Sequence, residues 1–129
     1  MASDPSAEFR ALRQQTGVTF SALTNKYDVT QRVVERWEGR NTPRPEALEY
    51  LRRLFAEDNA YLKETMKHIE KMETKKITLH KYRGAGHYYA VKGREGVLSW
   101  ERRERREQRL ISLLSLEGYE IEFDYYGPA

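Results

Sequence analysis

The sequence has no cysteine among its 129 residues, which excludes a disulfide framework, thiolate zinc sites and thiol catalysis. It also has no apolar run near the roughly 18 residues that a membrane span needs. The N-terminal stretch MASDPSAEFR lacks the basic and then apolar regions of a signal peptide. We therefore expect a cytoplasmic protein with no membrane partner.

Catalytic and metal-binding patterns are missing as well. His68, His80 and His87 do not have the spacing of metal ligands, and no nucleophile, base and orienting group gather in the sequence. The sequence therefore predicts neither an enzyme nor a bound cofactor or metal.

What the sequence does have is charge and enough apolar residues for a core. Charged residues make up 33% of the chain and hydrophobic residues 39%, with a formal net charge of +3. At this length about two thirds of the unfolded surface can be buried, so we expect a folded protein. The small net charge does not by itself indicate a nucleic-acid partner, so any such site must be a local face.

Residues 1–75 are predicted to form five helices joined by short turns. Capping residues and helical spacing place them at Ser6–Thr16, after a Thr19 cap, after a Thr30 cap, from Pro45, and at Asp58–Lys71.

The pattern changes after residue 75. Segments 77–82 and 119–126 alternate like strands, and 87–91 can pair with 77–82 as a hairpin. A highly charged helix is expected over 99–117. The predicted fold class is therefore mainly α, with a five-helix domain at 1–75 and a small α+β domain at 76–129.

Two short helices joined by a tight turn satisfy the packing demands of a helix-turn-helix. Leu23 and Tyr27 are expected to face inward from the first helix, Val29 to fill the turn, and Val34 and Trp37 to face inward from the second. The polar residues of the second helix then point outward.

This outward set has the chemistry of a DNA-binding surface. Gln can bond bidentately to adenine and Arg to guanine in the major groove, and Arg and Asn suit the phosphate contacts that fix register. The predicted phosphate-binding residues are Thr30, Arg40, Asn41 and Arg44.

Residues 9–54 resemble the helix-turn-helix of the phage Cro and repressor type, the Xre family. The likeness depends on Leu-Arg in the first helix, Val-Thr before the second and third helices, and RWEGRNTPRP at 36–45. In this family the first, second and sixth residues of the recognition helix meet bases, which implies base contacts for Gln31, Arg32 and Arg36. The chain departs from the family at Asp28, where the turn usually has Gly, and at Phe20, which replaces a Gln that touches phosphate.

The layout of the whole chain resembles anti-CRISPR-associated autorepressors that have a C-terminal dimerisation unit. This resemblance implies a transcriptional repressor that autoregulates a phage or mobile-element operon and binds an inverted-repeat operator in double-stranded DNA as a homodimer. The alternative is an antitoxin that neutralises a protein toxin and autoregulates its operon. The residues expected at the dimer interface are Leu110, Leu113, Leu114, Ile121, Phe123 and Tyr125.

Two features remain open to more than one interpretation. The run ERRERREQR at 101–109 favours a solvated, self-paired helix face with Glu101 beside Arg105, and a second phosphate-binding or RNA-binding surface is the alternative. Glu120, Glu122 and Asp124 share one strand face that could hold Mg²⁺, but a half-buried strand with one wet side is the simpler interpretation.

Overall fold

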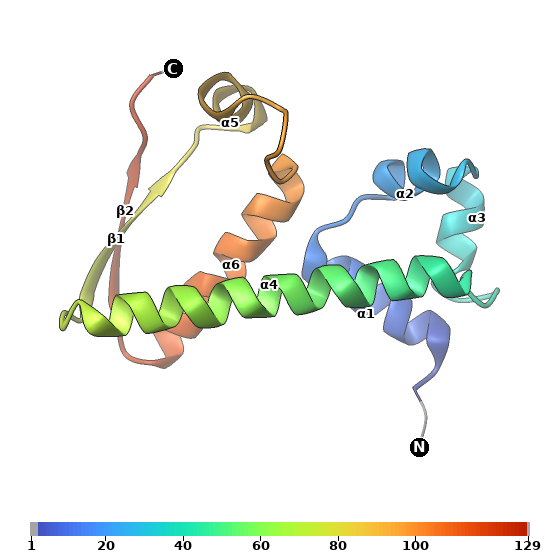
Figure 1. Cartoon of the computed structure of the whole chain (residues 1–129), viewed down its shortest axis with the longest axis horizontal. Helices are drawn as coiled ribbons and strands as arrows, with labels where there is room; N and C mark the ends of the chain where they lie inside the picture. Colours follow the sequence, from blue (N-terminus) through green and yellow to red (C-terminus); the bar gives the residue numbers. More distant parts are fainter. Residues whose placement is uncertain (1–2, 129) are drawn as a thin grey trace. The chain divides into compact units, whose positions relative to one another are not determined.

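The computed structural model describes residues 3–128 and is mainly helical, with one small sheet (Figure 1). Within these residues the chain divides into two compact units, the first ending at Ala60 and the second beginning at Tyr61. The elements, in chain order, are α1 (Pro5–Thr16), α2 (Phe20–Tyr27), α3 (Gln31–Arg36), α4 (Pro45–Lys71), β1 (Lys76–Lys81), α5 (Ala85–Lys92), α6 (Trp100–Leu116) and β2 (Glu120–Tyr125).

Helices α1, α2 and α3 begin after residues whose side chains cap them. Asp4 accepts hydrogen bonds from the backbone N–H groups of Ser6 and Ala7, at 2.8 and 3.2 Å, at the start of α1. Thr19 and Thr30 cap α2 and α3 in the same way. These contacts satisfy N–H groups that have no partner within the helix, which is why the predicted starts agree with the structure.

The core of the first unit brings together apolar residues from all four of its helical segments. Phe9 of α1, Leu23 of α2, Val34 of α3 and Leu51 of α4 have no exposed surface. The Trp37 ring meets the Phe9 ring edge to face, with centroids 5.8 Å apart. Paired aromatic rings add to the stabilisation from burial, so this core fixes the positions of the short helices.

Helix α4 is a single helix, where the sequence predicts two. Between Pro45 and Lys71 the only interruption signal is Asp58 beside Asn59, and both residues lie inside the helix. No proline or glycine follows Pro45 within it, so nothing removes a backbone donor or favours a left-handed turn. The prediction of a five-helix N-terminal domain is therefore wrong in this respect.

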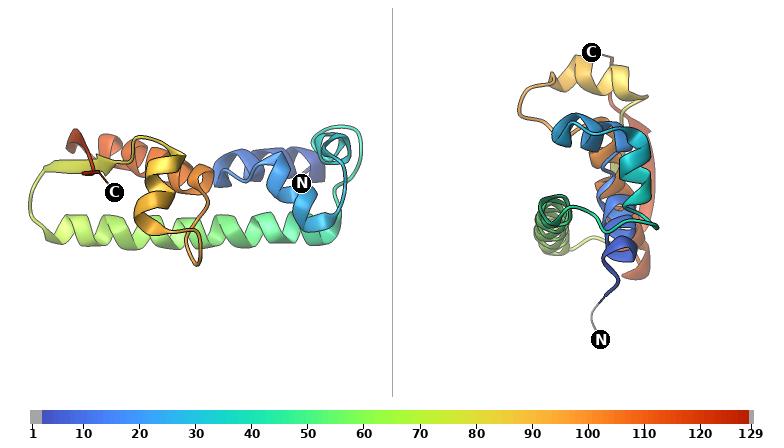
Figure 2. Two further views of the ribbon diagram at one scale, coloured as in Figure 1. Left: turned by 90° about the horizontal axis from the view of Figure 1, so that it is seen from above. Right: turned by 90° about the vertical axis from the view of Figure 1, so that its right-hand side faces the viewer.

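The unit boundary also lies earlier than the predicted division after residue 75. Leu62 and Ile69, from the second half of α4, are buried with Ile77, Leu110 and Leu114. Figure 2 shows α6 beside this part of α4. The second half of α4 therefore belongs to the core of the second unit.

The sheet of the second unit consists of β1 and β2, paired in parallel (Figure 1). The register sets Lys76 opposite Glu120 and Lys81 opposite Tyr125. Parallel neighbours need a long crossover, and α5 and α6 supply it here. The predicted strands at 77–82 and 119–126 both form, shifted by about one residue at their ends.

The predicted hairpin of 77–82 with 87–91 is wrong, because 87–91 lies in helix α5. Tyr88 is buried and its ring lies 5.1 Å from that of Tyr82. Its hydroxyl donates to the carbonyl of Leu98 at 2.8 Å, and burial raises the pKa of Tyr88. The tyrosines at 88 and 89, which are typical of a strand, therefore lie in a helix. The strand that pairs with β1 is β2.

Candidate nucleic-acid interface

The segment from α2 to α3 forms two short helices joined by a tight turn. Asp28 has φ of 52°, the left-handed conformation expected for it. The N–H of Val29 donates to the carbonyl of Thr24 at 3.2 Å, and Thr30 then accepts from the N–H of Val33 at 3.3 Å. These bonds determine where α3 begins.

The inward faces of the two helices are buried as their spacing predicts. Leu23 and Val34 have no exposed surface and Trp37 is 4% exposed. Tyr27 and Val29 are partly buried against the same core, and the Tyr27 ring lies edge to face with Trp37 at 6.2 Å. Because Val34 and Trp37 are buried in the core, the backbone of α3 is held in place and its exposed side chains project from a fixed position.

All three residues predicted to contact bases are exposed on α3. Gln31, Arg32 and Arg36 have exposed side chains, whereas Val34 of the same helix is buried, and Arg32 and Arg36 lie on the side of the helix away from Val34. The amide of Gln31 donates to the Glu35 carboxylate at 2.9 Å, so contact with a base requires this bond to open. Arg32 and Arg36 supply two guanidinium groups, the groups that bond bidentately to guanine.

Arg32 and Arg36 line a shallow depression of about 490 Å³ on the first unit. Arg10 of α1 and Arg40, just after α3, lie along the same depression. No sequence pattern links Arg10 to this surface, because only the packing of the helices brings this residue of α1 near α3. The lining also includes Phe20, Glu35, Glu38 and Gly39.

The negative charge of Glu38 in this lining is offset by an ion pair with Arg13. The Arg13 side chain is 18% exposed and the Glu38 side chain is 12% exposed. The Arg13 guanidinium also lies 4.0 Å from the centre of the Phe20 ring. Arg13 thus connects α1, the start of α2 and the turn after α3.

The predicted phosphate-binding residues do not all lie in equivalent positions. Arg40 and Asn41 are exposed in the turn after α3, where the N–H groups of both donate to the Arg36 carbonyl at 2.9 Å. Thr30 is exposed but its hydroxyl caps α3. Arg44 points to the Tyr27 carbonyl, at 3.5 Å, so only Arg40 and Asn41 are directly adjacent to the end of α3.

The predicted dimerisation residues separate into buried and exposed sets. Leu110 and Leu114 are 7% and 0% exposed within the chain, so they belong to the core and cannot form a surface. Ile121 is partly buried against that core. Leu113, Phe123 and Tyr125 remain exposed, at 38%, 55% and 52%.

The arginine-rich part of α6 is less solvated than its sequence predicts. Arg102 is buried, and Glu101 and Arg105 do not form the expected ion pair in the described part of the chain. Arg103 instead bonds Glu104 at 2.8 Å and Glu107 at 2.9 Å. Both carboxylates also pair with Lys81 of β1.

These ion pairs connect α6 with β1 and affect the ionisation of Lys81. Burial lowers the pKa of Lys81, but the hydrogen bonds and charges of Glu107 and Glu104 outweigh burial and raise it above its ordinary value. Much of the charge in this run therefore serves packing within the second unit.

The acidic face of β2 has a partner on β1. Glu122 pairs with Lys76 at 3.0 Å, while Glu120 and Asp124 are exposed. Among residues 3–128, no group of three His, Asp or Glu side chains is placed to hold a metal ion. Over the same range, no helix combines the length and the apolar character needed to cross a membrane.

Comparison with known proteins does not assign the chain to a family. None of the known protein-family models matches the chain, and no curated protein is significantly similar to it.

Proposed function

We propose that this protein is a sequence-specific, double-stranded DNA-binding repressor of the Xre type, with α3 lying in the major groove. The observation that supports this most is the arrangement of α3. Its inner side is buried through Val34, while Gln31, Arg32 and Arg36 project outward. A rigid backbone that presents amide and guanidinium groups is what direct reading of base edges requires.

Phosphate contacts would fix the register of α3 in the groove. Arg10 and Arg40 lie along the depression that also contains Arg32 and Arg36. Asn41 follows in the exposed turn. These side chains supply the sequence-independent part of the affinity, which makes binding depend on salt.

The repressor acts as a homodimer in this proposal. One recognition helix reads few base pairs, so a two-fold pair on an inverted repeat is needed for specificity. Leu113, Phe123 and Tyr125 are the exposed apolar residues that support an interface in the second unit. The order of elements along the chain resembles that of anti-CRISPR-associated autorepressors, which suggests that the protein represses its own phage or mobile-element operon.

Selection of bound duplexes from a random DNA pool tests this function. We expect enrichment of an inverted repeat whose half-site centres are about one helical turn apart. A pool with no enriched sequence would contradict sequence-specific binding. Enrichment only when a co-encoded protein is added would instead favour the antitoxin function.

A further inference from the structure

The exposed face of α3 carries one acidic residue beside its arginines. Glu35 is exposed and lines the depression of about 490 Å³ together with Arg32 and Arg36. Its carboxylate accepts a hydrogen bond from the amide of Gln31 at 2.9 Å. A negative charge at this place repels the phosphates of any DNA, so it lowers the affinity unless the DNA offers it a specific partner.

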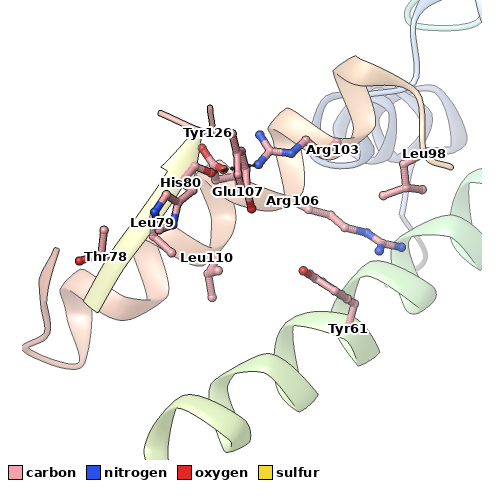
Figure 3. A pocket seen from close by; sticks show the side chains of 10 residues that line it. All are labelled: Tyr61, Thr78, Leu79, His80, Leu98, Arg103, Arg106, Glu107, Leu110 and Tyr126. Carbon is pink, nitrogen blue, oxygen red and sulfur yellow. Dashed lines mark hydrogen bonds and ion pairs between the residues drawn. The ribbon is translucent and has the colours of Figure 1, made fainter. Parts of the chain in front are cut away.

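The partner of Glu35 differs from that of a carboxylate used for packing. In the second unit, the Glu107 carboxylate pairs with the Arg103 guanidinium at 2.9 Å, as Figure 3 shows, so the two charges offset each other. The Glu35 carboxylate is bonded instead to the neutral amide of Gln31. An amide donates a hydrogen bond but does not neutralise the charge of Glu35.

The bond between Gln31 and Glu35 joins two residues that are four positions apart on α3. A contact between Gln31 and a base requires this bond to open, which takes the donor away from the Glu35 carboxylate. Leaving a carboxylate without a donor where DNA excludes water costs more free energy than leaving a neutral group so. Binding through Gln31 therefore favours DNA that supplies a new donor to Glu35.

The four bases differ in the donors that they offer in the major groove. Cytosine presents its N4 amino group, from which a glutamate can accept a hydrogen bond. Guanine presents the acceptors N7 and O6, and thymine presents the acceptor O4 beside a methyl group, so neither can bond a carboxylate. Adenine presents a donor next to the acceptor N7, a pair of groups that suits the amide of Gln31 instead.

We propose that Glu35 selects cytosine at the base pair that it meets, and that the opening of its bond with Gln31 couples this selection to the base contact of Gln31. The N4 amino group of cytosine replaces the Gln31 amide as the donor to Glu35. The charge of Glu35 weakens binding to DNA that lacks this cytosine, so it adds discrimination in both directions. This inference rests on the proposed DNA-binding function of α3 and gives it a further specificity-determining residue.

Selection from a random DNA pool, run in parallel with the full chain, Glu35→Ala and Glu57→Ala, tests the proposal. We expect the original chain to require cytosine at one position of each half-site, where guanine or thymine lowers the affinity about tenfold. Glu35→Ala should remove most of this penalty, keep the preferences at the other positions and bind random DNA more tightly. Glu57→Ala, which removes an exposed carboxylate of α4 outside the depression, should keep the cytosine requirement.

A second variant, Glu35→Gln, covers the case in which alanine at this position destabilises α3, which thermal unfolding would reveal. Its amide keeps an acceptor for Gln31, loses the charge and adds a donor that guanine and thymine can accept, so the cytosine preference should weaken here too. Enrichment by the original chain with the same base preferences in the folded variants would overturn this inference alone. No enrichment by the original chain would overturn the proposed function together with it.

Discussion

At the scale of single residues, the pair of Arg13 and Glu38 organises the surface that we assign to DNA. Glu38 lines the depression beside Arg36, and without Arg13 its carboxylate would repel phosphate. Because the pair is mostly shielded from water, salt screens it less than it screens an exposed pair. Arg13 thus acts on the interface indirectly, through the charge and position of Glu38.

Arg40→Ala should weaken binding to every DNA sequence by a similar factor. Arg40 is exposed after α3 and is assigned to phosphate, so its loss should lower the slope of log affinity against log salt by about one. Anisotropy titrations at several salt concentrations measure both quantities. Arg53→Ala, which removes an exposed arginine of α4 that lies over Tyr50, is the matched control and should change neither. A loss confined to the operator would assign Arg40 to base reading.

The ionisation of Glu8 gives a prediction that involves no DNA. Arg52 donates hydrogen bonds to the Glu8 carboxylate at 2.9 and 2.7 Å. These bonds, together with the positive charge of Arg52, lower the pKa of Glu8 by more than burial raises it, so this pKa lies below its ordinary value. This interaction stabilises the fold above the unfolded-state pKa of Glu8, and the benefit is lost as pH falls through the folded-state pKa.

Arg52→Gln should therefore move the pKa of Glu8 back toward its ordinary value. A carboxyl-detected NMR titration measures this, and the difference in unfolding free energy between the two proteins should shrink in acid. Arg53→Gln should leave the Glu8 titration unchanged. An unaltered pKa in Arg52→Gln would show that the pair does not persist in solution.

At the scale of elements, prediction succeeded where the signals are local. Thr19, Thr30 and the helical spacing of apolar residues place α2 and α3 correctly, because capping and periodicity act within a few residues. Prediction failed at 87–91, where strand-forming tyrosines lie in α5. The parallel pairing of β1 with β2 depends on contacts distant in sequence, which residue patterns do not contain.

The turn between α2 and α3 offers a test of the backbone conformation. At Asp28, φ is 52° and the residue is exposed, so substitution changes strain more than contacts. The Asp28→Gly variant should be more stable than the Asp28→Ala variant, with a free energy of unfolding about 1 kcal/mol higher. Alanine is strained in the left-handed conformation and glycine is not. Urea unfolding measures the difference. Equal stability of the two variants would contradict a left-handed Asp28.

At the scale of the whole molecule, the chain has two cores, and α4 contributes to both. Leu51 is buried in the first core and Leu62 in the second, although their spacing is continuous along one helix. A single sequence shows that these leucines are buried but not with which partners. For the same reason Leu110 and Leu114 were expected at the dimer interface, although the structure buries them in the second core.

The exposed apolar residues of β2 lead to a prediction about assembly. Phe123→Lys should leave the protein monomeric in sedimentation at concentrations where the original chain dimerises, because Phe123 is 55% exposed and is assigned to the interface. Affinity for the full inverted repeat should fall, with little change on a half-site. Val91→Lys, at an exposed apolar residue of α5, is the control. A dimer that survives Phe123→Lys would place the interface elsewhere.

The central claim is that α3 reads DNA bases through Arg32 and Arg36. Its most direct test is the ratio of affinities for the selected operator and for a scrambled duplex, measured with the original chain and with Arg32→Ala combined with Arg36→Ala. We expect each substitution to cost about 1–3 kcal/mol on the operator and much less on scrambled DNA, so the ratio should fall sharply. An equal loss on both duplexes, with the ratio unchanged, would contradict base reading by α3.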